Sequence, residues 1–130
     1  MKDPVWLSRQ ILMLLHGEAL AEHGGLDGVR DLGLLDSALS RPANRLACGG
    51  EHDLCSLAAA YASGIVRNHP FADGNKRAAF IAAVMFLELN GVSVALDEGE
   101  AIAATLDLAA GDLPEAGFAA WLRDNTTPRG

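Results

Sequence analysis

The chain has 130 residues, half of them apolar, and a formal net charge of −7 at neutral pH. This length suits one domain with one core. The negative charge argues against a protein whose main surface binds nucleic acid. No apolar run approaches the roughly 20 residues that a membrane-spanning helix needs, and the charged N-terminal stretch does not fit a signal peptide. We therefore expect a cytoplasmic protein that contacts neither nucleic acid directly nor a membrane.

Alanine and leucine are abundant and aromatic residues make up only 5% of the chain, a composition that favours helices over sheet. We predict an all-α, single-domain fold over residues 1–125, with a flexible tail at 126–130. The two cysteines, Cys48 and Cys55, form no CxxC pair and are interpreted as reduced thiols, with a disulfide as the less favoured alternative. The four histidines lack the spacing of a zinc site.

Asp3 and Pro4 fit the start of a first helix that runs to Ala21, with Gly24 ending it. His16 on this helix is interpreted as part of a polar edge at the surface.

Residues 26–30 are expected to form a plain loop. A short helix is expected at 31–40, with Pro42 beyond its end. We expect a turn of helix and then a mobile loop in 43–52.

Two segments are apolar almost all round and should form buried central helices. The first, 54–68, is capped by Asp53, and the second, 75–89, ends at Asn90. Residues 92–96 alternate in polarity and are expected to be extended. Helices are expected at 97–110 and from Pro114 onward.

The stretch that joins the two central helices is HPFADGNKR, residues 69–77. Pro70 disfavours the α region at His69, so the helix before it should stop and leave the imidazole on a loop. Asp73 is a plausible N-cap for the next helix, beginning near Gly74 or Asn75.

The first turn of that second helix leaves backbone amides without intrahelical partners at the positive end of the helix dipole, which makes an anion site. Lys76 and Arg77 add two positive charges beside these amides. The pattern therefore predicts a site that handles phosphate. Phe71 is interpreted as an anchor that packs the loop into the core.

This stretch resembles the motif of the Fic/Doc superfamily, which it matches at six positions: His69, Phe71, Asp73, Gly74, Asn75 and Arg77. The chain is more similar to the death-on-curing branch, the Doc toxins. Lys76 stands where AMP-transferring Fic enzymes have glycine, and Phe80 stands where they have a second arginine; both departures are shared with Doc. The resemblance implies a mainly helical fold of about six helices, with the motif loop between the two central ones.

The resemblance also implies an activity. Doc toxins move the γ-phosphate of a nucleotide onto a threonine of elongation factor Tu, which arrests translation, and an antitoxin of the Phd type blocks them. The expected cofactors are ATP, or another nucleoside triphosphate, and Mg²⁺. The alternatives are a Fic-type AMP transferase and a catalytically silent module that binds nucleotide or antitoxin.

By this resemblance His69 is the general base, because an imidazole titrates near neutral pH. Asp73 holds Mg²⁺, which prefers one or two carboxylates plus phosphate oxygens, unless its role is only to cap the helix. Lys76 and Arg77 neutralise charge on the transferring group.

Gly74 and Asn75 position phosphate oxygens in this reading, together with Lys76 and Arg77. Arg67 matches an arginine in Doc and is a further candidate for phosphate binding, with an ordinary surface arginine as the alternative. Many Fic proteins restrain themselves with an internal helix. Here the near match at Glu98 has valine in place of the serine or threonine of that motif, so we expect restraint by a separate chain.

Overall fold

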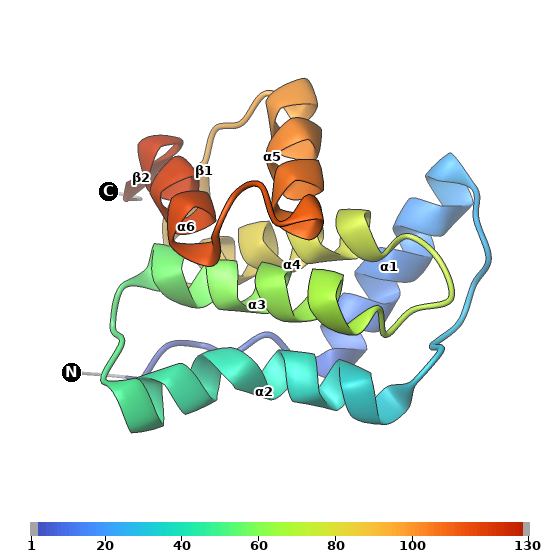
Figure 1. Cartoon of the computed structure of the whole chain (residues 1–130), viewed down its shortest axis with the longest axis horizontal. Coiled ribbons are helices and arrows are strands. Elements are labelled where there is room, and N and C mark those ends of the chain that lie inside the picture. Colours follow the sequence, from blue (N-terminus) through green and yellow to red (C-terminus); the bar gives the residue numbers. More distant parts are fainter. Residues whose placement is uncertain (1–2, 129–130) are drawn as a thin grey trace.

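A computed structural model describes residues 3–128 and places in them six helices and two short strands (Figure 1). In chain order these are α1 (Arg9–His23), α2 (Leu32–Gly49), α3 (Leu54–Asn68), α4 (Asn75–Leu89), β1 (Val92–Val94), α5 (Glu98–Ala110), α6 (Glu115–Asp124) and β2 (Thr126–Pro128). The prediction of a mainly helical domain with about six helices is confirmed. Within this range, no helix combines the length and the apolar character needed to cross a membrane.

The core is built around α3 and α4, which lie side by side (Figure 1). α2 packs along one side of α3 and α6 along another, while α1 and α5 pack against α4. Every residue of α3 from Leu57 to Val66 is buried, as expected for a helix that is apolar or small all round. A Cβ at Gly64 would lie 3.2 Å from Cα of Ala38, so this glycine lets α2 approach α3 closely.

The first helix begins later than the sequence predicts. Its N-cap is Ser8, whose side chain accepts a hydrogen bond from the amide of Ile11 at 3.1 Å, and not Asp3. Residues 3–7 lie outside the helix and are held by the core: the side chain of Asn90 bonds both backbone groups of Val5, and the amide of Leu7 donates to the Tyr61 hydroxyl.

The prediction of a short helix at 31–40 and a mobile loop after it is wrong, because α2 continues through Pro42 to Gly49. A proline inside a helix removes one hydrogen bond and normally kinks or ends it. Here Pro42 is buried in the same face as Leu35 and Ala38, so packing against α3 outweighs the lost bond. The helix ends at Gly50, which is left-handed with φ of 67°.

The extended piece expected after α4 is present as β1, and it has a partner that the sequence did not reveal. Thr126–Pro128 pairs with it in antiparallel register as β2, so the prediction of a flexible tail is wrong for residues 126–128. The amide of Ala95 also donates to the carbonyl of Asn125 at 2.9 Å, which extends the ladder. Residues 129 and 130 lie outside the described range.

The two cysteines are free in the structure, Cys48 exposed and Cys55 buried. Burial raises the pKa of the Cys55 thiol, with the hydrogen bond to Thr126 opposing it. A thiol of this kind is unreactive near neutral pH.

Replacing Asp53 by alanine should destabilise the fold, because this carboxylate caps α3 through Ser56 and also pairs with Arg123 of α6. Burial raises the pKa of Asp53, but the hydrogen bonds from Arg123 and Ser56 outweigh it and hold the pKa below its usual value. We expect Asp53→Ala to lower the free energy of unfolding at pH 7 by about 1–2 kcal/mol in urea titrations.

A depressed pKa stabilises the folded state above the unfolded value of about 3.9, and this stabilisation is lost as the pH falls through the folded pKa. The difference between wild type and Asp53→Ala should therefore shrink in acid. Asp107→Ala, at an exposed carboxylate with no partner in the described chain, is the matched control and should change stability little. Equal stabilities of wild type and Asp53→Ala at pH 7 would contradict the capping role.

Candidate active site

A cavity of about 490 Å³ opens between the loop that joins α3 to α4 and the helix α5. The motif loop and α4 supply one wall: His69, Ala72, Asp73, Gly74, Asn75, Lys76, Arg77 and Phe80. α5 supplies the other: Glu98, Ala101, Ile102, Thr105 and Leu106. The cavity thus has a polar, cationic wall facing a largely apolar one, and it brings together all the predicted site residues except Arg67.

His69 is the C-cap of α3 and lies exposed at the cavity, in the left-handed region with φ of 48° and ψ of 55°. Among the described residues it is the only one other than glycine with positive φ. The helix therefore ends where the sequence predicts. Such a conformation is uncommon and costs free energy unless its surroundings hold it in place.

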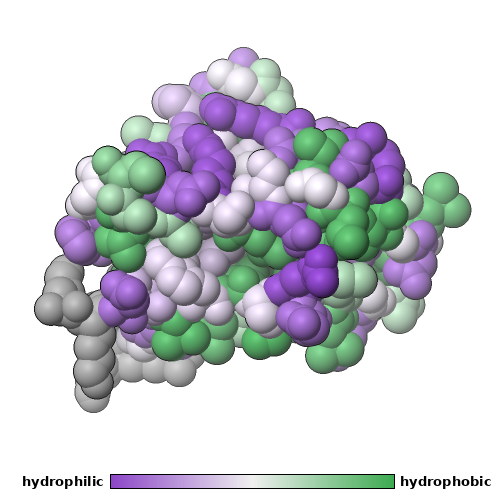
Figure 2. Space-filling view, turned by 90° about the horizontal axis from the view of Figure 1, so that it is seen from below, coloured by the Kyte–Doolittle hydropathy of each residue, from purple (hydrophilic) through white to green (hydrophobic). Residues whose placement is uncertain are grey.

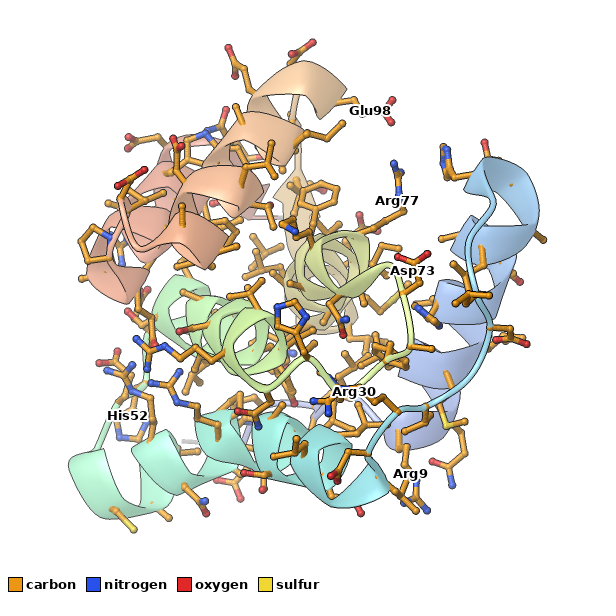
Figure 3. The ribbon with its side chains drawn as sticks, turned by 45° about the vertical axis from the view of Figure 1, so that its right-hand side comes forward. Arg9, Arg30, His52, Asp73, Arg77 and Glu98 are labelled. Atoms are coloured by element: carbon orange, nitrogen blue, oxygen red, sulfur yellow. The ribbon has the colours of Figure 1, made fainter. Side chains whose placement is uncertain are left out.

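Arg30 holds this helix end. Its Nε donates to the carbonyl of His69 at 2.7 Å and its Nη2 to the carbonyl of Asn68 at 2.9 Å. These carbonyls have no intrahelical partner, and a cation at a helix C-terminus is favourable. Figure 3 shows Arg30 reaching from the loop before α2 toward this corner. The sequence pattern did not single out Arg30, because nothing near it in the sequence indicates that its side chain contacts the end of a helix 38 residues later.

The segment expected to be a plain loop, residues 26–30, runs beside the motif and supports it. Val29 forms an isolated antiparallel bridge with Phe71. The amide of Ala72 donates to the carbonyl of Gly28 at 3.0 Å. The amide of Arg30 donates to the carbonyl of Pro70 at 2.7 Å. The motif loop is therefore fixed by backbone hydrogen bonds on one side.

Asn75 fixes the loop from within. Its Oδ1 accepts from the amide of Phe71 at 2.9 Å, and its Nδ2 donates to the carbonyl of the same residue at 3.1 Å. Nδ2 also lies 3.4 Å from Nδ1 of His69, which is long for a hydrogen bond and leaves either ring nitrogen free to carry the proton. The side chain is 8% exposed, so it holds the loop, while the backbone amide of Asn75 starts α4.

α4 begins without a side-chain cap. Gly74 occupies the cap position in the left-handed region, with φ of 72°, so the prediction of Asp73 as N-cap is wrong. Asp73 stands one residue too early to reach the first turn, and its Oδ1 accepts from the amide of Gly74 at 2.8 Å. In the described chain the amides of residues 75–77 have no acceptor, which leaves the positive end of α4 open at the cavity.

One carboxylate on the loop side of the cavity, that of Asp73, could contribute to a magnesium site. Across residues 3–128 no group of three or more histidine, cysteine or acidic side chains gathers as a metal site would. Asp73 is a single exposed carboxylate on the cavity wall. Because Mg²⁺ commonly takes one or two carboxylates and fills its shell with phosphate oxygens and water, Asp73 fits that role.

Arg77 lies across the mouth of the cavity (Figure 3), with Nη1 3.1 Å from Nε2 of His23 and 4.0 Å from Oε1 of Glu98. A guanidinium only donates, so Nε2 of His23 accepts and this ring is neutral in the bond. The Glu98 side chain is 75% exposed, and an exposed pair at this distance contributes little. The charge of Arg77 is therefore still available to an anion, as is that of exposed Lys76.

Arg67 lies outside this cavity. Although it is only two residues from His69, it lines a separate groove between α2 and α3. Arg67 lies in the last turn of α3, whereas His69 has left the helical conformation, so the two residues line different cavities. The phosphate contact of Arg67 stays a prediction.

His16 is the supporting residue that the sequence pattern misplaced. It is 3% exposed, and its Nε2 lies 2.8 Å from the carbonyl oxygen of Asp73. Its ring stacks on Phe71 with centroids 3.9 Å apart and planes at 17°. Because a carbonyl oxygen only accepts, His16 must carry a proton on Nε2.

The interpretation of His16 as a surface residue is therefore wrong. The buried positions of α1 are Leu12 and His16, while the apolar residues Ile11 and Leu14 are 38% and 64% exposed. The spacing of four residues between Leu12 and His16 was the available signal.

Two substitutions separate the contacts of His16. His16→Phe keeps a ring against Phe71 and removes the donor to Asp73, whereas His16→Gln keeps an N–H donor and removes the stacked ring. We expect His16→Phe to lower the free energy of unfolding by about 1–3 kcal/mol, the cost of leaving a carbonyl without its partner. We also expect faster amide hydrogen exchange in residues 72–75.

His16→Gln should retain slower exchange in that loop than His16→Phe. The matched control is His52→Gln, at an exposed histidine far from the motif, which should leave both quantities unchanged (Figure 3). If His16→Phe exchanges like wild type in residues 72–75, the bond to Asp73 does not hold the loop.

Comparison with known proteins agrees with this geometry. A model described as the Fic/DOC family matches residues 6–87, a span that contains both His16 and the whole motif loop. A protein named "Protein kinase doc" from Escherichia phage P1 is 34% identical over 117 residues, covering 90% of this chain and 92% of that protein. A protein named "Toxin Doc" from Mycolicibacterium smegmatis is 47% identical over 75 residues, covering 57% of this chain and 58% of that protein. With its fold, its motif loop and these relatives taken together, the chain belongs to the Fic/DOC family.

Proposed function

We propose that the protein is a Doc-like toxin that transfers the γ-phosphate of ATP, or another nucleoside triphosphate, to a threonine hydroxyl of elongation factor Tu and so arrests translation. The observation that carries this proposal is the cavity itself, which gathers an imidazole, a carboxylate, an open helix N-terminus and two cations. The relative named as a protein kinase supports phosphoryl transfer as the chemistry.

The triphosphate binds at the start of α4. Amides without acceptors and the positive end of the helix dipole favour phosphate oxygens at this place. Lys76 and Arg77 flank it and supply charge-assisted hydrogen bonds. Asp73 is the residue that would hold Mg²⁺, whose chemistry is to neutralise charge on the phosphate oxygens.

His69 removes the proton of the acceptor hydroxyl through an unprotonated ring nitrogen. The hydroxyl oxygen forms a bond to the γ-phosphorus while the bond from that phosphorus to the β–γ bridging oxygen breaks, and a nucleoside diphosphate leaves. Because phosphoryl transfer depends mainly on positioning and electrostatics, the fixed loop and the two cations matter most. Asn75, Arg30 and His16 act by holding that loop.

Lys76 favours transfer of the γ-phosphate over transfer of AMP. A glycine at this position leaves room for the outer phosphates to lie in the loop while the α-phosphate is attacked. The long cation at residue 76, exposed at the cavity, changes which phosphate is held there.

A separate chain, an antitoxin of the Phd type, restrains the enzyme. The internal alternative would be Glu98 at the start of α5, because its carboxylate faces Arg77 across the cavity mouth. That contact is long and exposed, too weak to block the site by itself.

Incubation with α-labelled or γ-labelled ATP, Mg²⁺ and elongation factor Tu tests the reaction. We expect label on the factor only from the γ position, and a fall of at least about a hundredfold in rate for His69→Ala, the scale of general-base catalysis. His52→Ala, at an exposed histidine outside the cavity, is the control and should retain activity. Label from the α position alone would establish AMP transfer and overturn the kinase proposal.

Glu98→Ala tests the source of restraint. Because the pair with Arg77 is exposed and 4.0 Å long, we expect the transfer rate of the purified protein to change by less than about threefold. A rise of an order of magnitude would show that the chain restrains itself. Glu100→Ala, two residues further along in the same exposed first turn, is the matched control.

A further inference from the structure

A second cavity, a groove of about 650 Å³, runs between α2 and the C-terminal part of α3. Its lining includes three arginines, Arg41, Arg45 and Arg67, with polar residues such as Ser40 and Asn44 between them. The lining also holds one acid, Glu51, and Glu115 pairs with two of the arginines, so three positive charges against two negative ones leave the groove with one net positive charge. The chain as a whole has ten lysines and arginines against seventeen acids. The face that carries α2 mixes hydrophilic and apolar residues without one continuous apolar sheet (Figure 2).

Two of these arginines are held in place by the fold. Nη1 of Arg41 lies 2.6 Å from Oε1 of Glu115, and Nη1 of Arg45 contacts Oε2 of the same carboxylate. The Glu115 side chain is 13% exposed, so this residue of α6 holds both guanidinium groups in place. Their Nε and Nη2 hydrogens have no acceptor within the described chain, and a guanidinium has five donors. The groove is thus preorganised for further acceptors, which lowers the entropy cost of binding.

Arg67 is exposed and has no hydrogen bond or ion pair with the described residues. It comes from α3, across the groove from Arg41 and Arg45 on α2. An anionic group in the groove would therefore meet donors from both helices.

The groove adjoins the catalytic cavity. Asn68 lines the groove and the next residue, His69, lines the cavity, so both open at the same end of α3. A chain that lies in the groove is brought within reach of the general base.

We propose that this groove binds an extended acidic segment of the protein substrate and holds it so that a neighbouring hydroxyl reaches His69. Arg41 and Arg45 are one helical turn apart, about 6 Å along the axis, which is close to the roughly 6.6–6.8 Å between alternate residues of an extended chain. Carboxylates at alternate positions therefore match the two arginines. Glu115 already occupies Nη1 of both arginines, so an incoming carboxylate would meet their remaining Nε and Nη2 donors.

The chemistry of the groove favours a peptide over nucleic acid. Its lining contains no aromatic side chain on which a base would stack. The chain is acidic overall, so an acidic partner is attracted only to its positive regions, of which the groove is one, and this orients the partner during encounter. The groove rests on its own observations, but its role in substrate selection rests on the function proposed above.

Binding is measured first, without catalysis. The probe is a fluorescent peptide of about six residues in which glutamate and serine alternate, long enough to span the groove, followed by fluorescence anisotropy at low salt. We expect wild type to bind it and Arg67→Glu to bind about tenfold more weakly, the loss of one charge-assisted contact. Arg9→Glu, the same change at an arginine that pairs with Asp36 on the surface, should bind like wild type.

Two further probes test the specificity of binding: an oligonucleotide of similar length, and a peptide with lysine in place of glutamate. We expect the lysine peptide to bind more weakly than the acidic one. Equal affinity of wild type and Arg67→Glu for the acidic peptide overturns the proposal, and so does Arg67-dependent binding of the oligonucleotide that is tighter than that of the peptide. His69→Ala should bind the peptide as wild type does, because its imidazole lies in the other cavity.

Kinetics then separate the groove from the reaction. With elongation factor Tu as acceptor, Arg67→Glu should raise KM for the protein about tenfold and leave KM for ATP unchanged. A rise in KM for ATP instead would assign Arg67 to the nucleotide and contradict the groove. If no phosphate transfer occurs while wild type still binds the peptide through Arg67, the proposed reaction fails and the groove remains as a docking site.

Discussion

The site depends on how α3 ends. α3 is buried along most of its length, so its end has a fixed position, and the forked contact of Arg30 with the carbonyls of Asn68 and His69 fixes the direction in which the chain leaves. His69 can then remain left-handed, a conformation that would cost free energy in a loose loop. The imidazole faces a cavity as a consequence of backbone geometry, and the rest of the motif follows from that corner.

The loop after this corner is held by side chains that do not face the reactants. Asn75 bonds both backbone groups of Phe71, while His16 stacks on the Phe71 ring and bonds the carbonyl of Asp73. With these groups engaged, the first amides of α4 and the Lys76 ammonium have no partner among the described residues, and Arg77 has only exposed contacts with His23 and Glu98. Sites that catalyse by electrostatics need donors that are fixed before the substrate binds. Here one set of residues holds the loop in place and another set faces the proposed ligand.

The sequence predicted the parts of this arrangement that are set by local patterns. The two central helices are apolar all round and begin or end at Asp53, Asn68 and Asn90, each a signal within a few residues of its effect. One error is local, the N-cap assigned to Asp73 where Gly74 holds that position. Most of the others concern contacts between residues far apart. His16 contacts Asp73, 57 positions later in the chain, and Arg30 contacts His69, 39 positions later. Strand β2 forms by pairing with β1, which is also distant in sequence. Pro42 inside α2 likewise depends on burial against α3, which no local propensity expresses.

The central claim is that the open start of α4 receives the triphosphate. The most direct measurement is a titration of ¹⁵N-labelled protein with Mg²⁺ and a non-hydrolysable ATP analogue, followed through the backbone amide resonances. The account predicts that the largest shifts occur at the amides of Asn75, Lys76 and Arg77, which have no acceptor without ligand. Shifts confined to the apolar wall of α5, with these three amides unchanged, would contradict it.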